Sequence, residues 1–141
     1  MLGHPLHPAV VHFPLALLLS ATAADVAWVA GITGDVHIAA VLMAGGLAMG
    51  LVAMAAGLID FAKLDEAVVP HALRHMAAVG DAWLGYAVAL YLRRDALSGA
   101  DTLGSISLAL SLASALLLAL GGWLGGRLVY TFGAGVDAVR R

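Results

Sequence analysis

The sequence predicts an all-α protein, an integral membrane four-helix bundle with up-down-up-down topology. Hydrophobic residues make up 62% of the 141 residues and charged residues only 11%, and the mean hydropathy is +0.98. Soluble domains are more polar than this, so we expect the chain in a bilayer. Four apolar segments reach the ~20 residues that a helix needs to cross a hydrocarbon core. In lipid such segments must be helical, because the backbone has to satisfy its own hydrogen bonds.

The predicted membrane-spanning helices cover residues 8–30, 36–61, 70–92 and 102–126. The connections between them are short and contain glycine or charged residues, which are poorly suited to lipid. Short connections join antiparallel neighbours and therefore give the alternating topology. We expect residues 1–141 to form a single transmembrane domain.

The first predicted helix shares one feature with a secretory signal, because Ala21-Thr22-Ala23 imitates a cleavage site. It lacks the positively charged start of such a signal, and its apolar run continues to a spanning length. We therefore expect this helix to be retained.

Composition excludes several classes of function. The chain contains no cysteine, which excludes disulfides, thiolate metal ligands and covalent c-type haem attachment. Its net charge of −2 provides no basic surface, so we expect no nucleic acid as a partner.

Histidines gather at one end of the predicted bundle. An even number of spans places both termini on one side of the membrane, together with the connection between the second and third helices. Five of the six histidines fall at this end, which we call the histidine end: His4, His7, His12, His71 and His75. Polar groups in membrane segments are costly and indicate function, so this end is predicted to hold a ligand or a metal.

Basic residues predict the orientation. The histidine end carries Lys63, Arg74, Arg127, Arg140 and Arg141, against Arg93 and Arg94 at the opposite end. The positive-inside rule therefore places the histidine end in the cytoplasm.

The prolines and the helical repeat predict how the histidines are presented. A residue before proline disfavours the α conformation, so Pro8 should be the first helical residue and His7 should precede the helix in an extended conformation. His12 then lies about 6 Å along the first helix and His75 about 7.5 Å along the third, which are similar depths. His71 precedes His75 by one helical turn and shares its face.

Each histidine also has a structural interpretation. His4, His37 and His71 fit histidines that lie in the membrane interface. His12 and His75 could be uncharged histidines that bond to a neighbouring helix.

The acidic residues have similar alternatives. Asp60 is expected to pair with Lys63 or Arg127 as a structural lock between the second and fourth helices, with a role as an oxygen ligand as the alternative. Asp25 is expected to reach the lipid headgroups at the far end of the first helix. Asp81 falls near the bilayer centre, where it should be protonated, bonded to a partner or part of a proton relay.

Small residues recur at helical spacing on two helices. They are Gly46, Gly50, Ala53 and Gly57 on the second helix, and the pairs Gly121–Gly125 and Gly122–Gly126 on the fourth. Such faces allow close helix packing, within the bundle or in a homo-oligomer. The alternative is that glycine leaves space for a flat cofactor.

Several motifs resemble a known bacterial membrane family, the domain of unknown function 2231. They are Gly3-His4-Pro5-Leu6-His7-Pro8, Val11-His12-Phe13-Pro14, Gly57-Leu58-Ile59-Asp60-Phe61, His75, the run from Gly122 to Tyr130, and Gly133-Ala134-Gly135-Val136. The resemblance implies a four-helix fold in the bacterial inner membrane. Because some relatives resemble parts of respiratory proteins, joined to Rieske-type or cytochrome modules, it also implies electron transfer.

The leading hypothesis is a non-covalent b-type haem. His12 and His75 would be the axial ligands, and Arg74 or Arg127 would meet the propionates. The protein would then pass electrons between a quinone or a soluble donor and a respiratory-chain partner, with no substrate chemistry of its own.

The second hypothesis is a site for copper, zinc or another divalent metal. Its ligands would be His7, His12, His71 and His75, with Asp60 as an oxygen ligand. A third hypothesis is a small transporter or a structural subunit of a larger complex, in which Asp81 and the histidines relay protons.

Overall fold

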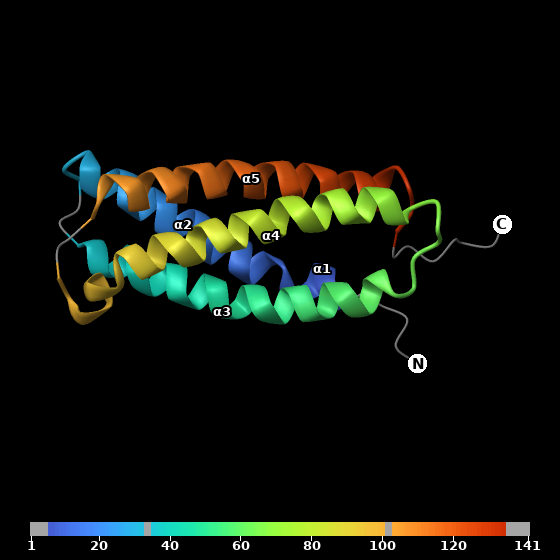
Figure 1. Cartoon of the computed structure of the whole chain (residues 1–141), viewed down its shortest axis with the longest axis horizontal. Coiled ribbons are helices and arrows are strands. Elements are labelled where there is room, and N and C mark those ends of the chain that lie inside the picture. The colour runs from blue at the N-terminus through green and yellow to red at the C-terminus, as the bar shows by residue number, and fades with distance from the viewer. Residues whose placement is uncertain (1–5, 33–34, 101–102, 135–141) are drawn as a thin grey trace.

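The computed structural model describes residues 6–32, 35–100 and 103–134, and in these residues it contains helices and no strands. The helices are α1 (Leu6–Val10), α2 (His12–Val29), α3 (Val36–Phe61), α4 (Val69–Leu92), the 3₁₀-helix η1 (Arg94–Ser98) and α5 (Ser105–Tyr130). The four long helices run alternately up and down, as Figure 1 shows. The predicted all-α four-helix bundle is therefore confirmed.

The start of the first helix differs from the prediction. α1 begins at Leu6, so His7 is helical although it precedes Pro8. The backbone bonds from Val11 N–H to the His7 carbonyl (3.0 Å) and from Leu15 N–H to the Val11 carbonyl (3.3 Å) carry the helical path on into α2. The bias against helix before proline is overcome here because both the backbone and the ring of His7 are held by α3.

The last helix lies further along the chain than predicted. α5 ends at Tyr130, four residues beyond the predicted end at Gly126. Its paired glycines were expected at the end of the helix, but they lie inside it. Of these glycines, Gly121 and Gly125 face α4, where a Cβ atom would meet Val79 and His75. Arg127 consequently belongs to the last turn of α5.

Three of the described helical segments are long and apolar enough to cross a membrane: His7–Val29, Val36–Phe61 and Ser105–Tyr130. Four had been predicted. The remaining long helix, α4, has 24 residues and lies alongside the others, but His71, Arg74, His75 and Asp81 make it less apolar.

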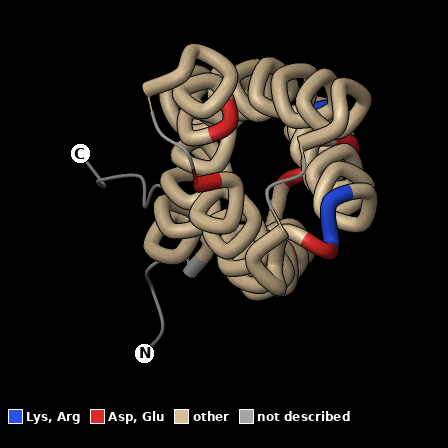
Figure 2. The backbone as a smooth tube through the Cα atoms, turned by 90° about the vertical axis from the view of Figure 1, so that its left-hand side faces the viewer, with Lys and Arg blue, Asp and Glu red and all other residues tan. Residues whose placement is uncertain are grey.

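The bundle consists of two helical hairpins. α2 packs mainly on α3, and α4 mainly on α5, while contacts of α3 with α4 and of α2 with α5 join the two pairs. We call α1–α3 the first hairpin and α4–α5 the second. The end view in Figure 2 shows the helices arranged around the long axis of the bundle, with few charged residues on them.

Glycines allow the helices within each hairpin to approach closely. A Cβ atom at Gly46 of α3 would lie 2.7 Å from Leu18 Cγ, and one at Gly121 of α5 would lie 2.5 Å from Val79 Cγ1. Neither position accommodates a side chain without a shift of its neighbour. In lipid, helices associate through such close packing, so these contacts hold the bundle together.

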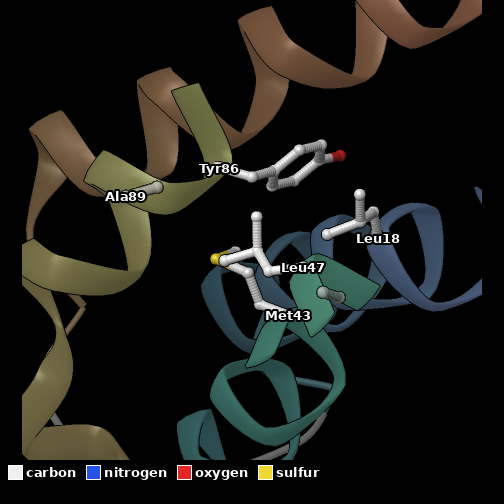
Figure 3. Packing of buried hydrophobic residues seen from close by; sticks show 6 residues of the cluster. Leu18, Met43, Leu47, Tyr86 and Ala89 are labelled. Atoms are coloured by element: carbon white, nitrogen blue, oxygen red, sulfur yellow. The ribbon is translucent and has the colours of Figure 1, made fainter. Parts of the chain in front are cut away.

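The centre of the bundle is apolar and draws on three helices. Leu18 of α2, Met43 and Leu47 of α3, and Tyr86 and Ala89 of α4 are buried in one cluster, and Figure 3 shows their side chains converging. The two hairpins are also joined by Trp83, whose Nε1–H donates to the Leu47 carbonyl at 3.0 Å, and by a bond of 2.7 Å between the Tyr86 and Thr22 hydroxyls.

A buried ion pair closes the end of the bundle opposite the histidines. Arg93, which follows α4, donates through a terminal guanidinium nitrogen to Asp25 of α2, and both side chains are 0% exposed. Arg93 Nε also donates to Ser107 Oγ at 2.7 Å, and Ser111 Oγ donates to Asp25 Oδ2 at 3.2 Å. Asp25 had been expected to reach the headgroups. It faces inward because Arg93 and the α5 serines satisfy it there.

Candidate functional site: a histidine pair

His7 and His75 face each other at the histidine end of the bundle. Their ring centroids are 6.1 Å apart and their planes are nearly perpendicular, at 83°. His7 belongs to α1 in the first hairpin and His75 to α4 in the second. The pair therefore lies where the two hairpins meet.

His7 is held by α3. Its ring atom Nδ1 bonds to the Ala53 carbonyl at 2.8 Å, and its backbone N–H donates to Asp60 Oδ2 at 3.1 Å. Gly57 lies beside the ring, since a Cβ atom there would come within 3.1 Å of His7 Nδ1. One face of α3 thus supplies the acceptors and the space for this histidine.

His75 is held in the same manner by α5. Its Nδ1 bonds to the Gly121 carbonyl at 2.8 Å. A Cβ atom at Gly125 would lie 3.0 Å from His75 Cε1, so glycine again provides the space for the ring.

These two bonds determine where each imidazole carries its lone pair. A carbonyl oxygen can only accept a hydrogen bond, so each Nδ1 must carry the proton. In the neutral ring the other nitrogen, Nε2, then has a free lone pair. An imidazole that donates through one nitrogen to a carbonyl and offers the other is the usual state of a histidine that ligates a metal.

The structure brings His7, and not His12, next to His75. His12 is the first residue of α2 and its side chain is exposed. The two histidines are five residues apart, so on one helical path they point about 140° away from each other. Only one of them can face the second hairpin.

The other histidines lie outside this pair. His71 stacks on Phe132 with a centroid distance of 4.1 Å and an interplanar angle of 26°. His37 bonds through Nδ1 to the Ala96 carbonyl at 2.9 Å, near the opposite end. His4 lies outside the described residues.

Among the charged candidates, Asp60 contacts the pair, through the backbone N–H of His7. Arg74 and Arg127 are exposed, and the guanidinium of Arg127 lies over the Trp123 ring, 5.1 Å from its centroid. Asp60 pairs with Lys63 at 3.6 Å, as predicted, although this contact is local and does not connect two helices. Asp81 is exposed on the outer side of α4.

The described residues contain no group of three or more His, Asp or Glu side chains that could hold a metal ion. His7, His12, His71, His75 and Asp60 are therefore not gathered into one cluster. The arrangement that the structure does provide is two imidazoles from two hairpins.

The glycines that make room for the two imidazole rings were not predicted from the sequence to contact them. Gly57 and Gly125 were recognised as packing residues, but their contact with an imidazole was not foreseen. The spacing offers a signal, because Gly57 and Gly125 each follow their histidine by 50 residues.

Comparison with known proteins gives one match. No curated protein and no solved structure matches this chain. The family described as "Predicted membrane protein (DUF2231)" matches residues 3–138, which is nearly the whole chain. With its apolar helices and its four-helix bundle, the chain thus belongs to this family of membrane proteins.

Proposed function

We propose that the protein binds a b-type haem through His7 and His75 and transfers electrons in the bacterial inner membrane. The observation that carries the proposal is the pair of fixed imidazoles at the junction of the hairpins. His7 replaces His12 as the proposed partner of His75, because His7 is the ring that lies opposite it.

The separation of the rings suits one shared metal atom. With metal–nitrogen bonds of about 2 Å, imidazoles on opposite sides of one metal have ring centroids about 6 Å apart. Ligands at a tetrahedral angle would bring the centroids to about 5 Å. The observed 6.1 Å agrees with the opposed arrangement.

The number of ligands favours haem over a bare metal ion. Haem supplies four nitrogens itself and needs only two axial ligands from the protein. A structural zinc site needs four protein ligands, and a catalytic site three. The described residues offer two histidines here, and Asp60 is engaged by His7 N–H and Lys63.

Two arginines at the same end of the bundle would form ion pairs with the haem propionates. Arg74 is one residue from His75 on α4, and Arg127 is two residues from Gly125 on α5. Both are exposed and each carries a permanent positive charge. The electron partner would be a quinone or a respiratory protein that approaches the cytoplasmic side.

The test is a visible absorption spectrum of detergent-purified full-length protein expressed with ample haem, oxidised and dithionite-reduced. We expect a Soret band and a sharp reduced α-band, both lost in H7A and H75A and retained in H12A. Loss of the bands in H12A with retention in H7A would refute the assigned pair.

A spectrum without these bands from well-folded wild-type protein would refute the haem. Metal analysis of the same sample would then distinguish a copper or zinc protein from a structural subunit.

A further inference from the structure

We infer that the bundle is built from two equivalent hairpins related by a two-fold axis parallel to the helices. The histidine site lies on this axis, with one equivalent ligand from each hairpin. Gly57 and Gly125 are then equivalent positioning residues that set the orientation of the two rings. The ligand role rests on the proposed function, whereas the equivalence rests on the contacts that repeat in the two hairpins.

A single sequence offset relates the residues that meet at both ends. Asp25 and Arg93 are 68 residues apart and form the buried ion pair. His7 and His75 are separated by the same 68 residues and form the ring pair. Two residues that occupy equivalent positions in two symmetric hairpins can touch each other only if both lie next to the two-fold axis. The two pairs therefore mark that axis at opposite ends of the bundle.

The bonds that hold the two histidines repeat with the same spacing. The His7 ring bonds to the carbonyl of a residue 46 positions later, Ala53, and the His75 ring bonds to Gly121, also 46 positions later. In both hairpins a glycine four residues beyond that carbonyl lies against the ring. The four-part arrangement of ring, carbonyl, glycine and helix pair thus occurs twice.

The helices follow the same symmetry. α2 and α4 run in one direction, and α3 and α5 run in the other (Figure 1). The contact of α2 with α3 corresponds to that of α4 with α5, and the contact of α2 with α5 corresponds to that of α3 with α4. Two copies of one hairpin around an axis produce this set of contacts.

The packing inside the hairpins also corresponds, with side-chain sizes exchanged. In the first hairpin a Cβ atom at Gly46 would lie 3.2 Å from Leu17 Cβ. The offset relates these residues to Ser114 and Gly85, and a Cβ atom at Gly85 would meet Ser114 Oγ. In the first hairpin the glycine belongs to α3 and the larger residue to α2, whereas in the second hairpin the glycine belongs to α4 and the larger residue to α5. The two helices touch at the equivalent position in both hairpins. Further buried residues correspond in pairs: Leu18 with Tyr86, Ala21 with Ala89, and Met43 with Ser111.

The equivalence has a consequence for the ligand. Two equal imidazoles with bare Nε2 atoms suit a centre that offers two opposed positions of the same kind, as haem iron does. A methyl group at position 57 or 125 would push its ring away from the carbonyl that fixes it. Both substitutions should therefore affect ligand binding by the same mechanism.

The experiment compares G57A and G125A, each with a control on its own helix. The control on α3 is G45A, because the new Cβ would meet only Leu17 Cδ1, at an ordinary contact distance of 3.6 Å. The control on α5 is G122A, because the new Cβ would meet nothing within 4 Å. Histidine ring ¹⁵N NMR of the cofactor-free full-length protein reports the tautomers, and haem titration of the same variants reports affinity.

We expect His7 and His75 both as the Nδ1–H tautomer in the wild type. G57A should shift only the His7 signals, and G125A only those of His75. Each should weaken haem binding by a similar factor, about tenfold or more, with a changed low-spin EPR spectrum, while the controls match the wild type.

Different tautomers for the two histidines, or a strong effect of one glycine substitution with none of the other, would overturn the equivalence. If the wild type binds no haem, the proposed function fails, and the NMR signals of the cofactor-free protein still decide whether the two rings are held alike.

Discussion

The two ends of the bundle use the same geometry for opposite purposes. At each end, residues 68 positions apart meet between the hairpins. Asp25 and Arg93 carry opposite charges and satisfy each other, with serines completing their hydrogen bonds. His7 and His75 are identical, and with both protons on Nδ1 their Nε2 lone pairs cannot satisfy each other. The Asp25–Arg93 pair satisfies its own charges and fastens one end of the bundle. The two histidines leave two Nε2 lone pairs that a third group could bind.

Breaking the complementary pair should have the largest effect. R93M would leave the Asp25 carboxylate buried without its partner, which costs about 3–5 kcal/mol of unfolding free energy. The measurement is denaturant unfolding in detergent, followed by circular dichroism. The double variant D25L/R93M should recover most of the loss, because no uncompensated charge remains. Equal destabilisation in both variants would show that the charges themselves are not the cause.

Removing one member of the identical pair should act through the ligand. At a free haem concentration of 100 times Kd, binding should stabilise the wild type by about 2.7 kcal/mol. H75A should show no haem-dependent rise in melting temperature, and H12A should show the full rise. A thermal shift in H75A as large as in the wild type would remove His75 from the site.

The hydroxyl bond next to the ion pair should have a smaller effect. Y86F removes the partner of the Thr22 hydroxyl, which keeps its bond of 3.3 Å to the Leu18 carbonyl. We expect a loss of about 1 kcal/mol in unfolding free energy and an unchanged haem spectrum. A spectral change would mean that the two ends are coupled through the core.

The exposed ion pair at the histidine end should have the smallest effect. The Lys63 side chain is 64% exposed, and its contact with Asp60 is 3.6 Å long. K63A should change the unfolding free energy by about 0.5 kcal/mol or less, and less still at high salt. A large loss of unfolding free energy would instead indicate that Lys63 holds the Asp60 carboxylate in place for its hydrogen bond from the His7 backbone N–H.

The fold was predictable because its signals are local. Long apolar segments and short polar connections specify four helices, and the glycine spacing specifies faces of close approach. The start at Leu6 was mispredicted because it depends on Asp60 and Ala53, which are distant in sequence.

The site was only partly predictable. The gathering of histidines at one end follows from topology, but the choice of His7 over His12 depends on how α1 is rotated against the second hairpin. Asp25 was misplaced for a similar reason, since Arg93 appears in sequence as a residue of the far surface. The repeated offset could have identified both pairs, because it relates His7 to His75 and Asp25 to Arg93 together.

The buried ion pair also has a consequence for how the protein is made. Synthesis proceeds from the N-terminus, so α2 and α3 are complete before Arg93 is added. Until then the Asp25 carboxylate has no guanidinium partner, and a charge in lipid is costly. The first hairpin therefore reaches its final form, with Asp25 paired, only after Arg93 has been added. Arrival of the second hairpin pairs Asp25 with Arg93 and brings His75 opposite His7, so the proposed ligand site forms only after the second hairpin has been added.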